Sequence, residues 1–334
     1  MQDAWHGGLL LVIAGVMNGS FALPMKRMPH WRWENIWFVW SVVALVVLPC
    51  VTALCYVPHV LSGLLEVPLS RLAVVALSGM AWGVAQVFFG LSVDAIGIAL
   101  TFSLVLGISA AMGALVPFLS LHAALLSTRA GGYLFAGLAV LTLGMVLCGW
   151  AGVLRETALD QTSATKSFSR GLSLAILSGL CASAMNIGFS FSDELKGMAT
   201  RHGASQPGSL IAIWLPLLLG GALPNILYSA FRLRRNRTAD NFRTQGTGGY
   251  WLMTVIMAVL WFGSTILYGV ASTMLGGLGA VLGWPAFMSI VVIMASFLGW
   301  FAGEWAGSGS RPLRTQIAGI IMLIVAVLLF SKAV

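Results

Sequence analysis

The sequence predicts an all-α polytopic membrane protein whose ten transmembrane helices form two inverted five-helix repeats. The first observation behind this prediction is composition: 59% of the 334 residues are hydrophobic and 8% are charged, and the mean hydropathy is +0.94. Soluble domains carry about 25% charged residues. The second observation is an internal echo, because the segment GVMNGSF at residues 15–21 returns as SAMNIGF at residues 183–189.

Ten charge-free apolar stretches are each long enough to cross the hydrocarbon core as a helix of about 20 residues. The predicted spans are residues 7–25, 36–57, 72–92, 97–118, 131–150, 172–192, 208–230, 250–272, 278–300 and 315–331. All Asp, Glu, Lys and Arg residues lie outside them, as expected because a charge at the centre of a span costs about 2.5 to 3.5 kcal/mol. The stretches are too long and too continuously apolar for barrel strands.

A second echo supports the division into two repeats. Three residues of the third span, Trp82, Phe89 and Gly90, have the same relative positions as three residues of the eighth span. The corresponding residues are Trp261, Tyr268 and Gly269. Because each half has an odd number of helices, the second half inserts with the opposite orientation, and transporters built this way bind substrate near the midplane. We therefore expect a first repeat at residues 1–150, a cytoplasmic linker at 151–170 and a second repeat at 171–334.

The distribution of basic residues predicts the orientation of the chain. Most of the 18 Lys and Arg residues lie in the connections after the first, fifth, seventh and ninth spans. The positive-inside rule places these connections in the cytoplasm. Both termini of this multi-pass protein are then periplasmic.

Glycine and proline predict close packing and one interrupted helix. Gly15 with Gly19, and Gly79 with Gly83, have the spacing that allows helix backbones to approach closely in a bilayer. Pro285 follows a glycine-rich run at residues 276–283. This combination predicts a discontinuous helix at Pro285.

Two asparagines are the first candidates for substrate contact. Asn18 and Asn186 occupy equivalent, near-central positions in the first span of each half. If both face one cavity, their amides offer donors and acceptors to substrate hydroxyls. The alternative is an interhelical hydrogen bond that holds the repeats together, worth under about 1 kcal/mol.

Aromatic residues beside polar ones extend this candidate site. Gln86 lies four residues after Trp82 and Thr265 four residues after Trp261, so each pair shares a helical face. Tyr268 adds a phenol and Trp284 an indole next to Pro285. Such pairs suit a sugar, which has apolar C–H faces and a rim of hydroxyls, although aromatic residues also face lipid. The tryptophans at span ends are expected to be interfacial anchors: Trp31, Trp33, Trp37, Trp40, Trp251, Trp300 and Trp305.

Carboxylates at the span borders are candidates for proton coupling. Asp193 and Glu194 end the sixth span on the expected outer side, while Glu34, Asp94 and Glu304 lie at the expected inner mouth. A carboxylate that becomes buried during the cycle would have a raised pKa and could carry a proton. The alternative for each is a solvated helix end.

Several function classes are disfavoured by the sequence. It contains no H-E-x-x-H zinc motif, no G-x-S-x-G nucleophile elbow and no P-loop, so we expect no enzyme, no cofactor and no metal site. The basic residues are spread over loops, which argues against a nucleic-acid partner. The first span has Asn18 where small exporters of cationic drugs use a glutamate. These features favour a neutral, hydroxylated substrate.

An ordered set of short motifs resembles one family over essentially the whole chain. The motifs are ALPMK at residues 22–26, WRWEN at 31–35, AWGVAQ at 81–86 with Gly90, GEW at 303–305 and RP at 311–312. Together they resemble the L-rhamnose–proton symporter family of the drug/metabolite transporter superfamily. The resemblance implies a bacterial inner-membrane importer of a 6-deoxyhexose, with Trp82 and Gln86 facing the sugar and Glu34 and Glu304 at the cytoplasmic end.

The sequence therefore predicts a secondary active transporter whose partners are a monosaccharide, a proton and the lipid bilayer. L-rhamnose is the expected cargo, carried by alternating access. One alternative is another sugar or metabolite on the same fold. A second is a membrane sensor that binds without transporting. Oligomeric state is left open.

Overall fold

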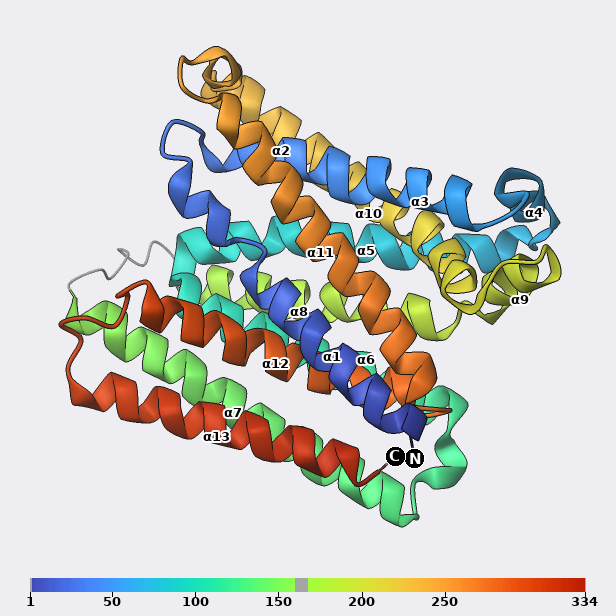
Figure 1. The fold of residues 1–334 in the computed structure, drawn as a ribbon. Helices are drawn as coiled ribbons and strands as arrows, with labels where there is room; N and C mark the ends of the chain where they lie inside the picture. Colours follow the sequence, from blue (N-terminus) through green and yellow to red (C-terminus); the bar gives the residue numbers. More distant parts are fainter. Residues whose placement is uncertain (1, 160–167, 334) are drawn as a thin grey trace.

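The computed structural model describes residues 2–159 and 168–333, and their regular structure is helical (Figure 1). The longer helices are α1 (Gln2–Ser20), α2 (Trp33–Val42), α3 (Leu48–Tyr56), α4 (Val60–Glu66), α5 (Leu69–Ile96), α6 (Ile98–Leu121), α7 (Arg129–Ala158), α8 (Phe168–Ser190), α9 (Asp193–Arg201), α10 (Gln206–Asn236), α11 (Gly248–Met274), α12 (Gly279–Phe301) and α13 (Ser310–Ser331). Short helical turns are η1 (Leu23–Arg27), η2 (Val43–Val47), η3 (Ala123–Leu125) and η4 (Ala239–Arg243).

Ten helical segments are long and apolar enough to cross a membrane, and each overlaps one of the predicted spans. The all-helical, ten-span prediction is therefore confirmed for the part of the chain that the structure describes. Several helices extend beyond the apolar run; α7, for example, continues to Ala158. A helix can extend into the polar interface because its backbone hydrogen bonds are made within the helix.

The spanning helices run along one long axis, which gives the molecule two ends (Figure 1). We call one the η1 end; it carries η1, η4 and the connection at residues 302–309. The opposite α9 end carries α4, α9 and both termini. The half of the bundle that includes each end is the η1 half or the α9 half.

Helix packing fits an inverted repeat. The first helix of the first half, α1, packs against α11 and α12, and its counterpart α8 packs against α5 and α6. The last helices, α7 and α13, pack against each other and lie together at the lower side of Figure 1. The precise division at residues 150 and 171 stays a prediction; within the predicted linker, residues 151–158 are helical, 160–167 lie outside the described residues, and α8 begins at Phe168.

Glycines bring two helix pairs into close contact. A Cβ added at Gly79 would lie 1.7 Å from the Leu217 carbonyl oxygen on α10, and one at Gly220 would lie 2.0 Å from that of Ala76 on α5. On α1, a Cβ at Gly15 would lie 2.4 Å from the Ile290 side chain. Larger residues at these positions would separate the helices.

The discontinuous helix predicted at Pro285 is wrong, because α12 runs without interruption from Gly279 to Phe301. The chain turns earlier, at Gly276, whose φ of +82° is a left-handed conformation that glycine adopts without strain. A helical irregularity occurs instead in the second span, where η2 is a π-helical segment just before Pro49. Single π turns are common near functional sites.

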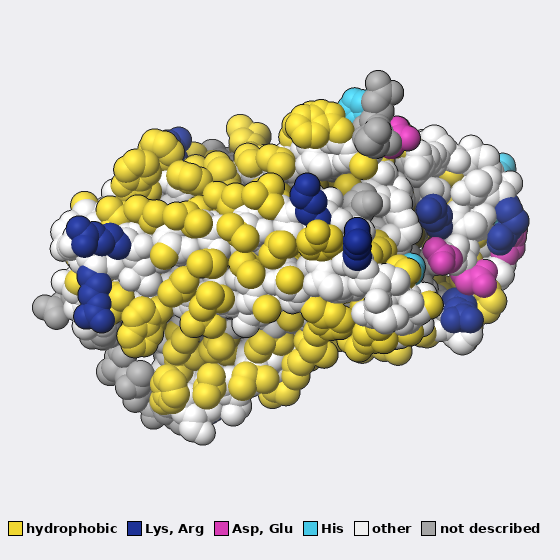
Figure 2. Space-filling view, turned by 90° about the horizontal axis from the view of Figure 1, so that it is seen from below, with side chains coloured by type: hydrophobic (Ala, Val, Ile, Leu, Met, Phe, Trp, Pro, Cys, Tyr) yellow, Lys and Arg dark blue, Asp and Glu magenta, His cyan; other side chains and the backbone are white. Residues whose placement is uncertain are grey.

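The outer surface is strongly apolar. Figure 2 shows hydrophobic side chains over much of the face seen, with Lys and Arg at its left edge, near its middle and, together with Asp and Glu, at its right. Exposed apolar residues include Leu143 and Val146 on α7 and Ile321 and Leu328 on α13. A bilayer is the solvent that suits such a surface.

Candidate substrate site

The predicted substrate residues form two groups joined by α11. The first, the tryptophan group, contains the predicted residues Asn18, Trp82 and Trp261 together with Trp40 and Ser264, which the sequence did not predict as substrate contacts. The second, the asparagine group, contains Asn186, Tyr268 and Trp284. Trp261 and Tyr268 lie seven positions apart in the sequence of one helix, so they share a face of α11 about two turns apart.

The tryptophan group is centred on two stacked indoles. The ring centroids of Trp82 on α5 and Trp261 on α11 are 5.3 Å apart with an interplanar angle of 27°. Trp40 meets Trp261 edge to face, with centroids 5.2 Å apart. Asn18 Nδ2 donates to Ser264 Oγ at 2.8 Å. Helices α1, α2, α5 and α11 thus bring an amide, a hydroxyl and aromatic faces together.

The asparagine group is a closed hydrogen-bond network. Tyr268 donates its hydroxyl to Asn186 Oδ1, and Asn186 Nδ2 donates to the carbonyl oxygens of Gly113 at 2.8 Å and Ala280 at 3.0 Å. Trp284 Nε1 donates to the Ser109 carbonyl at 3.0 Å. These bonds tie α8 and α11 to α6 and α12 near the α9 end.

Burial separates the two asparagines. Asn186 is 0% exposed and Tyr268 1%, whereas Asn18 is only partly buried. Both donors of the Asn186 amide are used within the protein, so in this conformation Asn186 makes the interhelical contact that the sequence left open as an alternative. Its contact with substrate stays a prediction.

Two further polar candidates, Gln86 and Thr265, and the polar residue Asn225 have distinct surroundings. Gln86 is partly exposed one turn beyond Trp82 on α5. Thr265 donates its hydroxyl to the Phe262 carbonyl of its own helix at 2.7 Å. Asn225 on α10 accepts a hydrogen bond from Trp37 Nε1 at 2.9 Å. The structure therefore brings Gln86 near the tryptophan group by its place on α5, while Thr265 is turned to its own backbone.

Two tryptophans expected to be interfacial anchors, Trp31 and Trp40, are buried, with Trp31 4% exposed. Trp40 is 1% exposed, and its Nε1 is buried without a hydrogen-bond partner in the described part of the chain. Trp37 packs against it with ring centroids 4.5 Å apart. Their spacing with Trp33 places all three on one face of α2, a signal in the sequence that the anchor interpretation overlooked.

The candidate carboxylates for proton coupling differ in their exposure to solvent. Asp193 and Glu194 lie exposed in the first turn of α9, and Asp94 is exposed near the end of α5. Glu34 is 2% exposed, and its Oε1 accepts hydrogen bonds from Asn236 Nδ2 at 2.8 Å and Thr238 Oγ1 at 2.9 Å. Glu34 is thus held by the end of α10.

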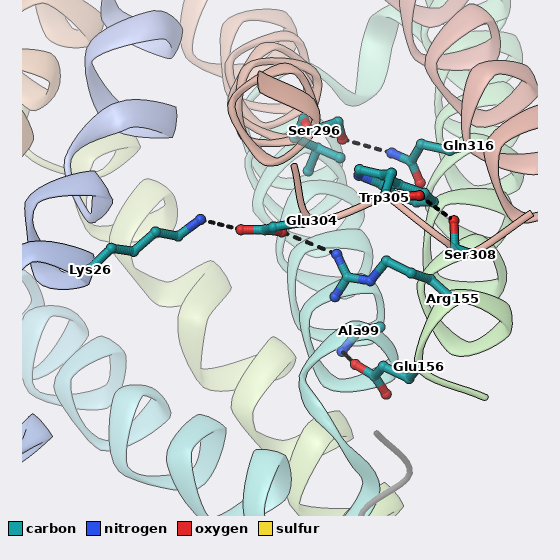
Figure 3. A network of polar contacts seen from close by, with 10 residues as sticks. Lys26, Ala99, Arg155, Glu156, Ser296, Glu304, Trp305, Ser308 and Gln316 are labelled. Carbon is teal, nitrogen blue, oxygen red and sulfur yellow. Dashed lines mark hydrogen bonds and ion pairs between the residues drawn. The ribbon is translucent and has the colours of Figure 1, made fainter. Parts of the chain in front are cut away.

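Glu304 joins two cationic side chains at the η1 end (Figure 3). Lys26 from η1 donates to Oε1, and Arg155 from the end of α7 donates to Oε2 at 3.1 Å. Burial alone would raise the pKa of Glu304, but the hydrogen bond and charge of Lys26, with those of Arg155, outweigh it and lower the pKa. Glu304 is therefore ionised at neutral pH and links the segment after α1 to the ends of α7 and α12.

Comparison with known proteins gives a consistent result. A family model described as L-rhamnose-proton symport protein matches residues 1–333. An L-rhamnose-proton symporter of Klebsiella pneumoniae subsp. pneumoniae is 23% identical over 329 residues, covering 96% of this chain and 94% of that protein. One of Cronobacter sakazakii is 24% identical over 334 residues, covering 98% of this chain and 97% of that protein. The chain therefore belongs to the L-rhamnose-proton symport family, a family of transporters and not of enzymes.

Proposed function

We propose that this protein imports L-rhamnose together with a proton across a bacterial inner membrane by alternating access. The observation that carries the proposal is the family match over residues 1–333. The tryptophan group gives it a physical basis, because stacked indoles beside amide and hydroxyl groups suit the C–H faces and hydroxyls of a deoxysugar. The bilayer is the remaining partner.

In this proposal both termini and the α9 end are periplasmic, and the η1 end is cytoplasmic. The support is the excess of basic residues at the η1 end, including Lys26, Arg155, Arg232 and Arg243. Rhamnose then enters from the α9 end and leaves at the η1 end.

The structure corresponds in this proposal to a conformation closed towards the periplasm. The asparagine group and the close contact of α5 with α10 at Gly79 fill the periplasmic half. Asn18, Trp82, Gln86 and Trp261 make the part of the site present in this conformation. Asn186, Thr265, Tyr268 and Trp284 join it when the network opens and releases their polar groups.

Trp40 is added to the site as a further substrate contact. Its buried Nε1 has no partner among the described residues, and an unpaired buried donor costs about 1 to 3 kcal/mol. A rhamnose hydroxyl at the tryptophan group would accept from it. Binding therefore gains from satisfying a group that is unsatisfied in the empty protein.

Glu34 is the leading residue for proton coupling. A coupling carboxylate must be shielded from bulk water in part of the cycle, and Glu34 is 2% exposed, whereas Asp193, Glu194 and Asp94 are exposed in this conformation. Glu304 takes a different role: its ion pairs with Lys26 and Arg155 bridge the cytoplasmic mouth and must break for the mouth to widen.

The test is uptake of radiolabelled L-rhamnose into proteoliposomes, with and without an inward proton gradient and with unlabelled sugars as competitors. Accumulation that requires the gradient and is blocked by excess L-rhamnose supports the proposal. Accumulation blocked only by another sugar would move the assignment to that cargo. Binding without flux in folded protein would favour a sensor.

A further inference from the structure

A polar pocket lies at the η1 end, away from the tryptophan group. It has a volume of about 460 Å³ between the start of α2 and the end of α10, within the ~300–1,000 Å³ typical of small-molecule sites. Its lining combines an indole, a carboxylate, two guanidinium groups, an amide and a hydroxyl. The residues are Arg32, Trp33, Glu34, Arg232, Asn236 and Thr238.

One polar atom in this pocket lacks a partner. Arg232 Nε is buried and makes no hydrogen bond within the described residues. Opposite charge is supplied by Glu34, whose Oε1 already accepts from Asn236 and Thr238. A ligand that fits must therefore offer an acceptor to Arg232 and tolerate a carboxylate nearby.

A continuous series of aromatic contacts joins this pocket to the tryptophan group. Trp33 stacks on Trp37 with ring centroids 5.4 Å apart, and Trp37 contacts Trp40 at 4.5 Å. Trp40 in turn contacts Trp261. These contacts form a continuous aromatic row along α2 between the η1 end and the tryptophan group.

The lining favours a neutral polyhydroxylated ligand over an anion. Sugar hydroxyls both donate and accept, and so can satisfy Arg232 Nε while donating to the Glu34 carboxylate. The phosphate of a lipid headgroup would gain from Arg32 and Arg232 but would lie against Glu34, and like charges at close range repel. The indole of Trp33 adds the apolar surface that a sugar ring requires.

We infer that this pocket is a second binding site for the transported monosaccharide, occupied as the sugar leaves towards the cytoplasm. The ligand and the direction rest on the proposed function. Because Glu34 lines the pocket, sugar and the coupling carboxylate meet there at release. The site is distinct from the tryptophan group in residues and in position along α2.

The test compares the two sides of the membrane in the full-length protein. In right-side-out vesicles, the half-saturating concentration of L-rhamnose for uptake reports the periplasmic approach; in inside-out vesicles, the corresponding value for L-rhamnose added to the cytoplasmic face reports the exit. Arg232→Gln is expected to raise the cytoplasmic value about tenfold, because a hydrogen bond from a charged donor is lost, and to leave the periplasmic value within about twofold.

The matched control is Arg235→Gln, since Arg235 is exposed on the same helix end and lies over the Phe231 ring, outside the pocket.

The outcomes are separable. Equal changes on both sides, or none on either, in a variant that transports would overturn the second site and leave the proposed function standing. A variant effect that appears only when vesicles contain phosphatidylglycerol would assign the pocket to a lipid headgroup instead. Absence of L-rhamnose transport by the unmodified protein would instead defeat the proposed function.

If Arg232→Gln does not fold, Trp33→Ala is measured in the same way, with Trp33→Phe as its conservative partner. An increase in the cytoplasmic half-saturating concentration alone in Trp33→Ala, which Trp33→Phe restores, supports the site. Any other pattern rejects it.

Discussion

Asn18 and Asn186 occupy equivalent places in the two halves of the sequence but opposite environments in the structure. Asn186 is fully buried, with Tyr268 and two carbonyl oxygens as partners; Asn18 is partly exposed and donates to Ser264. The contrast extends to whole helices, since every residue from 208 to 218 of α10 and from 281 to 289 of α12 is buried in the α9 half. Towards the η1 end, by contrast, Glu304 and Lys26 meet in an exposed ion pair.

Two halves of similar sequence can therefore adopt different conformations within one chain. In alternating access one half of the protein closes while the other is released. We propose that the asparagine group lies in the closed half of that exchange and the tryptophan group in the half that opens. Substitutions in the two groups should therefore have different effects on stability and on transport.

The largest expected effect is in the tryptophan group. Trp261→Ala removes the contacts with both Trp82 and Trp40 and is expected to lower L-rhamnose uptake by about a hundredfold, because the aromatic face proposed to bind the sugar is lost. This loss corresponds to about 2.8 kcal/mol, since each 1.4 kcal/mol is a factor of ten. The measurement is initial uptake rate in proteoliposomes with equal amounts of folded protein. Trp261→Phe keeps an aromatic face and should retain a measurable fraction; uptake in Trp261→Ala close to that of the unmodified protein would exclude Trp261 from the site.

The next effect concerns proton coupling at the η1 end. Glu34→Gln keeps an acceptor for Asn236 and Thr238 but cannot exchange a proton. We expect at least a tenfold loss of gradient-driven accumulation, corresponding to about 1.4 kcal/mol, while exchange of labelled for unlabelled L-rhamnose continues. Asp193→Asn, at an exposed position, serves as the control. Retained accumulation in Glu34→Gln together with loss in Asp193→Asn would transfer the coupling role to α9.

A paired substitution compares the two asparagines directly. Asn186→Ala leaves the Tyr268 hydroxyl and two carbonyl groups without their partner and is expected to destabilise the closed conformation by about 1 to 3 kcal/mol. Asn18→Ala loses a bond at a partly exposed position and should cost about 1 kcal/mol or less. Thermal unfolding in detergent measures both; a larger loss in Asn18→Ala would reverse the assignment of the closed half.

The smallest effect is expected from the exposed ion pair. Because the pKa of Glu304 is lowered from the model-compound value of 4.5, its contribution to stability is present above about pH 4.5 and is lost as the pH falls through the lower folded-state value. Exposed pairs of this kind contribute at most about 1 kcal/mol. Unfolding temperature against pH should therefore fall more steeply below pH ~4.5 in the unmodified protein than in Glu304→Gln. If the two proteins lost unfolding temperature equally as the pH falls, the ion pair of Glu304 would make no contribution to stability.

The sequence was sufficient to predict the ten spans because continuous apolar runs are required by the bilayer itself. It was not sufficient for local details that depend on packing. Pro285 lies within α12 because Gly276 already makes the turn. Trp40 was assigned to the interface because an apolar helix does not reveal which of its faces meets protein and which meets lipid.

The candidate site could be predicted in part. Trp82 and Trp261, which occupy matching positions in the two halves, stack on each other. Asn18 lies in the tryptophan group and Asn186 in the asparagine group. What the sequence could not provide was the difference between Asn18 and Asn186, because one sequence encodes both conformations of a transporter and local pattern does not specify which half is closed. The buried position of Glu34 likewise depends on the end of α10, far away in the chain.

The most direct test of this asymmetry is the reactivity of introduced cysteines towards a membrane-impermeant thiol reagent. In protein whose Cys50, Cys55, Cys148 and Cys181 are replaced by alanine, Gln86→Cys reports on the tryptophan group and Ser272→Cys, at a buried position near Tyr268, reports on the asparagine group. We expect Gln86→Cys to react from the cytoplasmic side and to be protected by L-rhamnose, while Ser272→Cys stays unreactive from the periplasmic side. Faster periplasmic labelling of Ser272→Cys than cytoplasmic labelling of Gln86→Cys would contradict this expectation.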